Sequence, residues 1–352
     1  MYLHIISPGM LTTIQDLGRG SYRAFGLPCA GAMDALSLKI ANILAGNPPG
    51  TAALEITLVG PSITFEGFGI MALTGADLGA RLNGWHLPAA GSFVVNDGDR
   101  LTFSGSDSGC RCYLAARGGY VLPQVMGSYS TYLRGEFGGY RGRALKAGDH
   151  LNVADTPVGG QAPFWVGSLP SLSGLLNIYS DSKSSCPVVR VIMGPQDDYF
   201  DDESIALFLS TEWQVSNEAD RMGYRLSGAT LKHRNKKEIV SDGILSGAIQ
   251  VPAQGIPIVL LADAQTAGGY PKIATVISSD LRIFGQLQPG DFVRFTSVDR
   301  EEAVRALKEE ERIQNELITL VACQPAGQPA PYEVFIDGQS YKVTVQRVYK
   351  CI

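Results

Sequence analysis

The sequence predicts a mainly β fold with a few helices. Short apolar runs such as 70–73 and 188–193 alternate with turns rich in Gly, Asn and Asp along most of the 352 residues. Residues 83–103 have the pattern strand, turn, strand, turn, strand, and an Asn83-Gly84 pair is typical of a two-residue hairpin. With 45% hydrophobic and 18% charged residues, the chain is long and apolar enough for two domains or one large all-β domain.

A Gly-Asp turn before a strand recurs along the chain. It occurs at Gly98-Asp99, Gly148-Asp149 and Gly290-Asp291. Such turns are common in barrels, so a structural role is the default interpretation. Their spread predicts barrel-like units in both halves of the chain.

Three helices interrupt the β pattern. Leu36 and Ile40 belong to a run with helical spacing, which predicts a helix over 33–44, and Gly46 is a C-terminal stop signal. A second helix is predicted near 202–209. The third, rich in Glu, Lys and Arg, is predicted over 299–320, with an acidic capping pattern at its start.

The composition divides the chain into domains. We predict an N-terminal β-rich unit over 1–175 and a C-terminal barrel unit over 187–297, because the stretch 161–187 is rich in Gly, Ser and Pro. A Pro-rich linker is predicted over 324–331. Residues 332–352 read as a hairpin with an Asp-Gly turn.

Several classes of function are excluded. The net charge of -5 argues against a nucleic-acid partner. The longest apolar run, 256–262, is too short to cross a bilayer, and the N-terminus does not read as a signal peptide, so we expect a cytoplasmic protein without a membrane partner. The four histidines lack metal-ligand spacing, so no metal site is expected. No Gly-x-Ser-x-Gly elbow or Walker loop is present, and we expect the cysteines to be reduced.

Two blocks of motifs are more specific than turns and strands require. The first block consists of Thr13–Gly20 (TIQDLGRG), Gly26–Asp34 (GLPCAGAMD), Ala41–Asn47 (ANILAGN) and Leu54-Glu55. The second consists of Ser241–Ile244 (SDGI), Gly247–Pro252 (GAIQVP), Gly255–Ile258 (GIPI) and Ala262–Pro271 (ADAQTAGGYP).

In these blocks the chain resembles the family that contains the C subunit of 5-oxoprolinase, the second part of the urea carboxylase carboxyltransferase domain (allophanate hydrolase subunit 2 type) and an antagonist of a sporulation-kinase inhibitor. The resemblance runs from about Ile5 to Phe295. It implies a fold of two cyclophilin-like β-barrel units. One departure is Ala267, where the family usually has a second Thr, and this difference bears on the substrate.

The resemblance implies three alternative functions. The first is the C subunit of an ATP-dependent 5-oxoprolinase, which opens 5-oxoproline to glutamate with the A and B subunits. The second is half of a biotin-dependent carboxyltransferase acting on urea or a related amide. The third is a non-catalytic antagonist that binds a B-like kinase-inhibitor partner.

The cofactors and partners follow from these alternatives. ATP is expected at the level of the complex. Biotin, if used, is carried by another chain, because no Met here is followed by Lys as a carrier requires. The expected partners are a smaller B-like subunit, a lactam-hydrolase A subunit and a small amide or lactam substrate. The isolated chain is expected to be inactive.

The residues of the first block suggest an anion site. Gln15, Asp16 and Arg19 cluster at a Gly-rich turn, where Arg19 is suited to hold a carboxylate or phosphate, or to pair with a loop carboxylate. Asp34 near a helix start either complements the helix dipole or contacts substrate. Asn42 lies in an apolar helix and needs a partner when buried, so Asn42 with Glu55 favours a structural role over substrate contact.

The second block suggests a pocket. Asp263, Gln265 and Thr266 follow an apolar strand, and the glycines after them expose backbone N–H groups to an oxyanion. Amide donors, an Arg and a carboxylate suffice to polarise an amide carbonyl. We predict that both blocks line one cleft, with Asp263 and Gln265 at its floor. The predicted catalytic residues are Arg19, Asp34, Asp263 and Gln265, and the predicted substrate contacts are Gln15, Asp16, Asn42, Glu55, Gln250, Thr266, Gly268, Gly269 and Tyr270.

Overall fold

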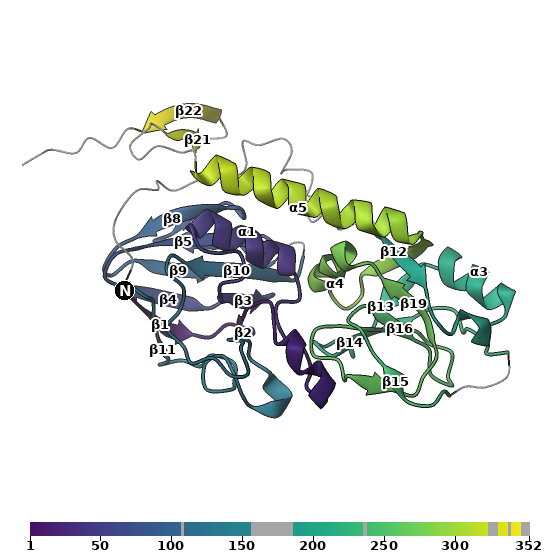
Figure 1. Ribbon diagram of the computed structural model, residues 1–352. Coiled ribbons are helices and arrows are strands. Elements are labelled where there is room, and N and C mark those ends of the chain that lie inside the picture. Colours follow the sequence, from purple (N-terminus) through teal and green to yellow (C-terminus); the bar gives the residue numbers. More distant parts are fainter. Residues whose placement is uncertain (107–108, 156–185, 235–237, 323–329, 337–338, 346–352) are drawn as a thin grey trace, which may run out of the picture.

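The computed structural model has two units side by side, with one long helix, α5 (Arg300–Ala322), running along both (Figure 1). The N-terminal unit contains strands β1 to β11, and the C-terminal unit begins with β12. The structure describes residues 1–106, 109–155, 186–234, 238–322, 330–336 and 339–345. The predicted boundary at 161–187 and the predicted linker 324–331 lie largely outside these residues.

Two sheets enclose one core in the N-terminal unit. Their strand orders are β11-β1-β4-β9-β6-β7 and β2-β3-β10-β5-β8. The strands are β1 (Tyr2–Ser7), β2 (Leu11–Gln15), β3 (Ala53–Thr57), β4 (Ser62–Glu66), β5 (Gly69–Gly75), β6 (Ala80–Leu82), β7 (Trp85–His86), β8 (Gly91–Val95), β9 (Arg100–Phe103), β10 (Arg111–Ala116) and β11 (His150–Asn152). Side chains of both sheets, such as Phe65 and Leu114, meet in one apolar cluster.

Helix α1 (Ala35–Ala45) covers the outer face of the five-stranded sheet. The side chain of Asp34 caps its N-terminus by accepting a hydrogen bond from the Ser37 N–H. Gly46 ends it in the left-handed region, at a φ of 80°, where glycine carries no steric cost. The helix therefore occupies nearly the range 33–44 that the sequence predicts.

The five-stranded sheet is buried on both faces. Alternate side chains of β10 point to opposite sides, so Leu114 lies in the core between the sheets while Tyr113 and Ala115 pack against α1. This is why all six residues of β10 are buried. It also places the polar side chains Tyr113 and Glu55 beside the first turn of α1.

The C-terminal unit is a closed barrel with the strand order β12-β19-β16-β17-β14-β13-β20. Its strands are β12 (Val188–Met193), β13 (Trp213–Val215), β14 (Gly223–Ser227), β16 (Ala248–Gln250), β17 (Ile258–Leu260), β19 (Lys272–Val276) and β20 (Phe292–Ser297), and a separate pair is formed by β15 (Asp242–Gly243) and β18 (Ala267–Gly268). Its core contains Trp213, Phe208, Phe284 and Phe295. Helices α3 (Asp202–Ser210) and α4 (Leu281–Gln286) pack against the barrel.

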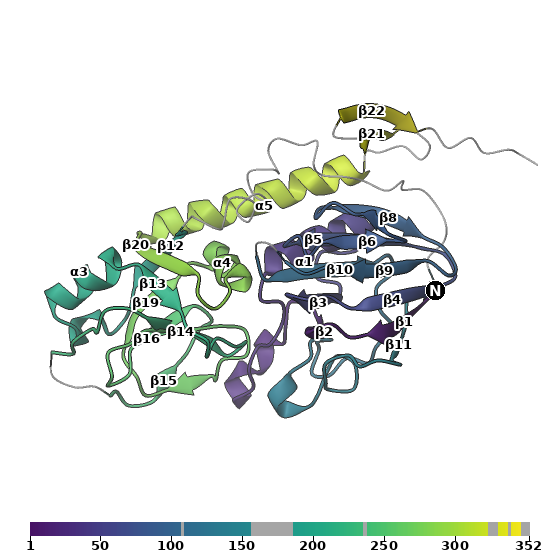
Figure 2. The same ribbon diagram turned by 180° about the vertical axis from the view of Figure 1, so that it is seen from behind.

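Helix α5 (Arg300–Ala322) runs along the two units, as Figure 2 shows from behind. Its first turn is capped by Asp299, which accepts the Glu302 N–H at 2.7 Å. Further along, Ile313 and Leu317 are buried against α1. Helix α5 also contacts the short 3₁₀ helix Ser278–Asp280, which precedes α4. One helix is thus packed on elements of both units.

The three Gly-Asp turns have one structure. Each glycine has a positive φ, at 81°, 86° and 95° for Gly98, Gly148 and Gly290. Each following Asp accepts a hydrogen bond, at 2.7 Å, from the backbone N–H three residues before it. A strand then begins, in both units. The motif is therefore a turn-closing device.

The mainly β fold predicted from the sequence is confirmed. Within it the C-terminal unit is the closed barrel, while the strands of the N-terminal unit are divided between two sheets around one core. Strands β21 (Ala330–Ile336) and β22 (Gln339–Val345) pair with each other as a separate two-stranded sheet. Among the described helices, none is long and apolar enough to cross a membrane.

Candidate active site between the two units

The segment 29–34 of the first motif block lies against the second unit. The Ala30 N–H donates to the carbonyl of Ala262 at 2.9 Å. The Met33 N–H donates to Glu55 at 2.8 Å, and the Met33 side chain is buried in the core of the C-terminal unit. The two motif blocks are therefore in direct contact.

Arg221 joins the carboxylates of the two blocks. It follows β13 and is only 6% exposed. Its Nε and Nη2 each donate to one oxygen of Asp263, both at 3.1 Å. Its Nη1 donates to Glu55, and its Nη2 also donates to the Gly31 carbonyl at 2.5 Å. Asp263, from the second block, and Glu55, from the first, thus share one guanidinium.

Burial and charge act in opposite directions on the pKa values of Asp263 and Arg221. Burial raises the pKa of Asp263, and the Arg221 guanidinium opposes that shift. Burial alone lowers the pKa of Arg221, but the Glu55 and Asp263 carboxylates outweigh it and raise that pKa. We conclude that Arg221 is cationic and holds Asp263 toward its ionised form.

Glu55 is the centre of the network on the side of the N-terminal unit. The Tyr113 hydroxyl donates to it at 2.7 Å, and Arg111 Nε lies 3.8 Å from it. Arg111 Nη1 continues into the other unit, donating to the Tyr224 hydroxyl at 3.0 Å and to the Gly285 carbonyl at 2.7 Å. These contacts account for the burial of Glu55, which is 2% exposed.

Asp34 connects helix α1 to helix α4. It caps α1 through Ser37, and it accepts a hydrogen bond from Gln286 Nε2 at 2.9 Å. The Gln286 Oε1 in turn accepts the backbone N–H groups of Cys110 and Arg111 at 3.0 and 2.9 Å. The helix-start interpretation of Asp34 is thus the one its contacts favour.

Asp16 organises the turn that carries Arg19. Its Oδ1 accepts the Gly18 N–H and the Ser128 hydroxyl, both at 2.7 Å, and the Ser130 hydroxyl at 2.5 Å. Its Oδ2 accepts the Tyr129 N–H at 2.7 Å. Both oxygens of Asp16 therefore accept hydrogen bonds from neighbouring groups of the turn and of the segment 128–130.

Arg19 is a buried arginine whose hydrogen-bond donors are only partly used by the described residues. It is 2% exposed, donates through Nη2 to the Ser130 carbonyl, and lies over the Phe137 ring at 5.0 Å. Among the described residues, its Nε and Nη1 have no hydrogen-bond partner. Burial lowers the pKa of Arg19, and the charges of Asp16 and Asp263 are among those that oppose this shift. Arg19 is therefore a buried cation with two nitrogens suited to bind an anion or a carbonyl oxygen.

Gln15 is the last residue of β2, four residues before Arg19 in the same block. Its Nε2 donates to Thr13 Oγ1 at 3.0 Å and to the Thr131 carbonyl at 3.2 Å. Its Oε1 is buried without a partner in the part of the chain that the structure describes. Gln15 is completely buried.

Asn42 does not pair with Glu55, in contrast to the pairing considered from the sequence. Its Nδ2 donates to the carbonyls of Leu38 at 3.1 Å and Thr51 at 2.6 Å, and its Oδ1 accepts from Asn47 at 3.0 Å. These bonds fasten the end of α1 to the next loop. Asn42 thus has a structural role.

The remaining predicted residues of the second block lie on or near strands β15 and β18, and we call this region the rim of the candidate site. Gln265 and Thr266 are half-buried, and Tyr270 is 40% exposed. Gln250 is buried and donates weakly to the Tyr270 carbonyl, at 3.4 Å. Gly268 pairs with Asp242 in the β15–β18 ladder. The 3₁₀ helix Gly20–Phe25 reaches this rim, where Arg23 donates to the Ile244 carbonyl.

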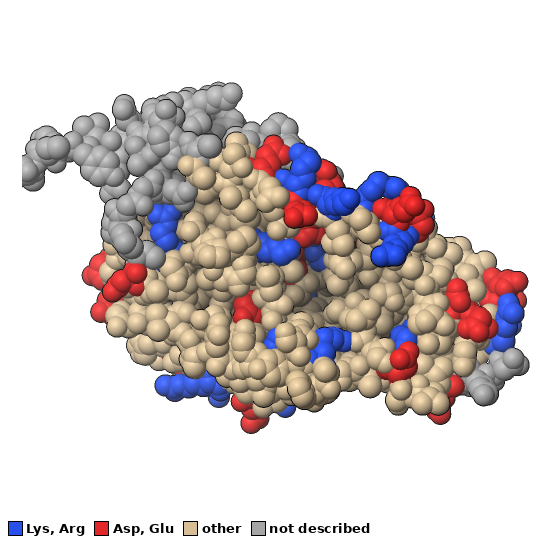
Figure 3. All heavy atoms as spheres, viewed as in Figure 1, with Lys and Arg blue, Asp and Glu red and all other residues tan. Residues whose placement is uncertain are grey.

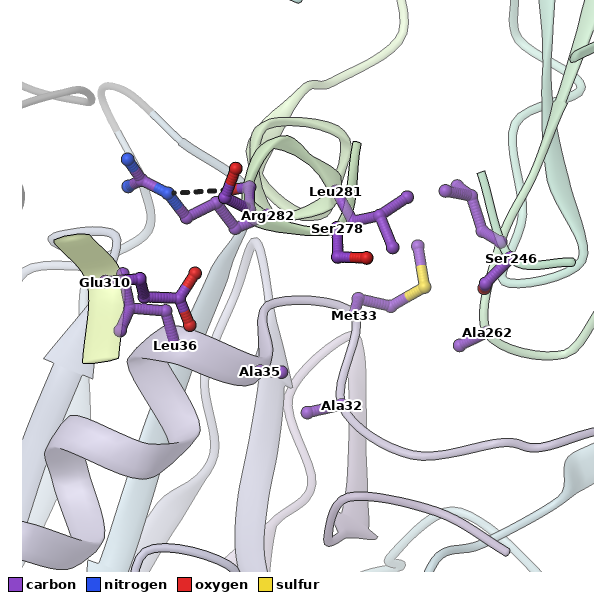
Figure 4. A pocket seen from close by; sticks show the side chains of 12 residues that line it. Ala32, Met33, Ala35, Leu36, Ser246, Ala262, Ser278, Leu281, Arg282 and Glu310 are labelled. Carbon is purple, nitrogen blue, oxygen red and sulfur yellow. Dashed lines mark hydrogen bonds between the residues drawn. The ribbon is translucent and has the colours of Figure 1, made fainter. Parts of the chain in front are cut away.

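A pocket of about 100 Å³ opens beside this network (Figure 4). Its lining includes Met33 from the first block and Ala262 from the second. Its polar and charged lining residues are Ser246, Ser278, Ser279, Arg282 and Glu310. The lining contains both sequence neighbours of Asp34 and the residue before Asp263, but none of the predicted site residues. Figure 3 shows the surface hollowed between the units beneath α5, with charged side chains around the hollow.

Sequence reasoning missed the residues that join the two units. Among the described residues, Arg221, Arg111 and Gln286 carry most of the hydrogen bonds between the units, and Tyr113 holds Glu55 within the N-terminal unit. None of the four lies in either motif block. The one available signal was charge at the start of an apolar strand, as at Arg221 before β14. In the described part of the chain, no group of three His, Cys, Asp or Glu side chains is placed to hold a metal ion.

Comparisons with known proteins agree on one family. The family described as carboxyltransferase domain, subdomain A and B, matches residues 25–297. The C subunit of Escherichia coli 5-oxoprolinase is 39% identical over 321 residues, which cover 90% of this chain and 97% of that protein. Urea amidolyase of Saccharomyces cerevisiae is 34% identical over 323 residues, 88% of this chain but only 17% of that protein. The crystal structure of K. lactis urea amidolyase has a TM-score of 0.81 at 30% identity, covering 90% of this chain and 20% of that one.

Proposed function

The chain belongs to the family described as carboxyltransferase domain, subdomain A and B, and we propose from this membership that it is the C subunit of an ATP-dependent 5-oxoprolinase. With the A and B subunits it opens 5-oxoproline to glutamate. The observation that carries the proposal is the match to the C subunit of a 5-oxoprolinase over nearly the whole of both chains. The chain spans about a sixth of the yeast urea amidolyase, so most of that protein has no counterpart here.

The proposed site lies between the units, where the two motif blocks meet. Arg19 offers two nitrogens, Nε and Nη1, that have no partner among the described residues, and the charge of the Asp263 carboxylate raises its pKa against the effect of burial. We assign to Arg19 the anionic group or the developing oxyanion of the substrate, and to Asp263 the proton transfer or the orientation of the amide. Gln265 and Thr266 are the half-buried polar groups nearest in sequence, suited to hold the lactam.

The other predicted residues support this site. Asp16, Asp34, Asn42 and Glu55 have their polar atoms engaged by neighbouring groups, so we assign them the task of fixing the turn, the helix and the unit contact. The walls and rim of the proposed site are assigned to the other predicted residues, Gln15, Gln250, Gly268, Gly269 and Tyr270. ATP acts at the level of the complex, with the A subunit, and the smaller B-like subunit completes the site.

The second candidate is half of a biotin-dependent carboxyltransferase acting on urea or a related amide. The description of the family and the similarity to urea amidolyase favour it. It requires the same polarisation of an amide or ureido carbonyl. Biotin would reach the site on another chain.

Reconstitution separates these functions. The chain is purified alone and with its cognate A and B subunits, and glutamate formation from 5-oxoproline and ATP is measured. The proposal expects turnover by the three-subunit complex and little or none by the chain alone. Robust activity of the isolated chain contradicts the multi-subunit proposal. A complex that forms no glutamate, but carboxylates urea with a biotin-bearing partner, supports the second candidate.

A further inference from the structure

Arg221 is placed where the two units meet, and its three kinds of contact belong to three segments. Asp263 follows β17 in the C-terminal unit, while Glu55 lies on β3 and Gly31 in the segment 29–34 of the N-terminal unit. The guanidinium therefore holds Asp263 in a fixed position relative to the other half of the site.

No other side chain can make this set of contacts. Arginine presents five N–H donors in a rigid plane, and here three of its nitrogens serve two carboxylates and a carbonyl. Lysine has one ammonium group, whose donors radiate from a single atom. It can neutralise the charge but cannot hold Asp263 with two parallel bonds and also reach Glu55.

The segment 29–34 depends on the same contacts. Its backbone N–H groups are used at Ala30 and Met33, by Ala262 and by Glu55 respectively, and its Gly31 carbonyl is held by Arg221. Loss of the guanidinium removes the Gly31 contact directly and takes one of its cationic partners from Glu55, the acceptor of the Met33 N–H, which keeps its contacts with Tyr113 and Arg111. Because Met33 lines the pocket, a looser segment 29–34 also changes the wall of the pocket.

We propose that Arg221 is a positioning residue, which aims the carboxylate of Asp263 and locks the segment 29–34 so that the two halves of the site keep one geometry. This inference rests on the proposed function for its catalytic part. Its structural part concerns this chain alone and is testable without turnover.

Four charged groups surround Asp263 and govern its ionisation. Arg221 faces it directly and lowers its pKa, Glu55 and Asp220 raise its pKa, and Arg19 in the first block is within electrostatic range of it. Burial raises the pKa of Asp263 further, and Arg221 counteracts it. Removal of the guanidinium therefore shifts the titration of Asp263 to higher pH.

The first experiment is amide hydrogen exchange on the chain alone. Arg221→Met is compared with Arg190→Met, which removes another arginine that donates through two nitrogens to one aspartate, Asp280, within the C-terminal unit. We expect the Ala30 and Met33 amides to exchange at least about tenfold faster in Arg221→Met, and not in Arg190→Met. Unchanged protection in Arg221→Met overturns the proposal.

The second experiment measures kcat and KM for 5-oxoproline in the reconstituted complex over a range of pH. Arg221→Met should lower kcat about a hundredfold with little change in KM, and the acid limb of its kcat–pH profile should move to higher pH. Arg221→Lys retains the charge, so its acid limb should stay near that of the wild type while kcat remains low.

Two kinetic results overturn the inference: a wild-type kcat in Arg221→Lys, or an unshifted acid limb in Arg221→Met. A wild-type complex that forms no glutamate refutes the proposed function instead. In that case the exchange comparison still decides whether Arg221 positions the segment 29–34.

Discussion

Replacement of Asp263 by Asn tests the candidate site with a nearly isosteric change. In the wild type both oxygens of Asp263 accept hydrogen bonds from Arg221, each at 3.1 Å. An asparagine keeps one acceptor and turns an NH₂ group toward the other N–H of Arg221. One charge-assisted bond is thus lost, and the other becomes a bond to a neutral acceptor.

The size of the effect follows from these contacts. A hydrogen bond to a charged group contributes about 1.5–3 kcal/mol, so we expect the free energy of unfolding to fall by about 2–3 kcal/mol. The loss stays below the ~3–5 kcal/mol of a fully broken buried pair, because Glu55 still pairs with Arg221. Turnover of the complex should fall about a hundredfold, which corresponds to ~2.7 kcal/mol of activation free energy.

The assay pairs denaturant unfolding of the chain with glutamate formation by the reconstituted complex. Asp149→Asn is the matched control, since Asp149 accepts from Arg143 at 2.7 and 2.8 Å in the N-terminal unit. We expect the control to lose stability and keep its kcat. An Asp263→Asn complex of normal rate would falsify the assignment of Asp263 to the site.

Three further predictions concern stability. Deletion from Pro325 onward should leave the melting temperature of the main body nearly unchanged, because β21 and β22 pair only with each other among the described strands; a large drop would mean that the hairpin packs on the core. Leu317→Ala, at a fully buried position against α1, should cost about 2–5 kcal/mol of unfolding free energy, whereas Ile318→Ala, at a 41% exposed position, should cost under about 1 kcal/mol; equal losses would contradict the packing of α5. Hydrogen bonding to Arg143 lowers the pKa of Asp149 from its ordinary 3.8, so the pair stabilises the fold above that pH and the benefit disappears as pH falls through the folded-state pKa. The stability difference between wild type and Asp149→Asn should therefore vanish in acid, and a difference that persists there would be inconsistent with this titration.

Local features of the chain could be predicted from the sequence because their causes are local. The Asn83-Gly84 turn joins β6 and β7 as the hairpin signal indicates. Helix α1 lies between its caps, the Asp34 carboxylate and the left-handed Gly46, and both signals are encoded next to the helix in the sequence. The Gly-Asp turns are equally local, since each Asp bonds a backbone group three residues away.

The role of each polar residue was harder to predict from the sequence than the local turns and caps. The sequence places Asp16, Asn42 and Glu55 in motif blocks, but it does not distinguish a residue that faces a ligand from one that holds the frame. That distinction depends on which donors surround each side chain. Asp16 bonds to the segment 128–130, more than a hundred residues away, and only the fold brings these together.

The sequence by itself determined the β class, the turns, the caps and the two blocks in which the candidate site lies. Tertiary structure alone decided that the blocks meet through Arg221, which no motif indicated and which joins Glu55 and Asp263 across 166 and 42 residues of sequence. The physical reason is burial. An arginine in water needs no partner, but at 6% exposure it must find carboxylates and carbonyls to satisfy its donors, and those partners come from whichever segments the packing of the two units sets around it.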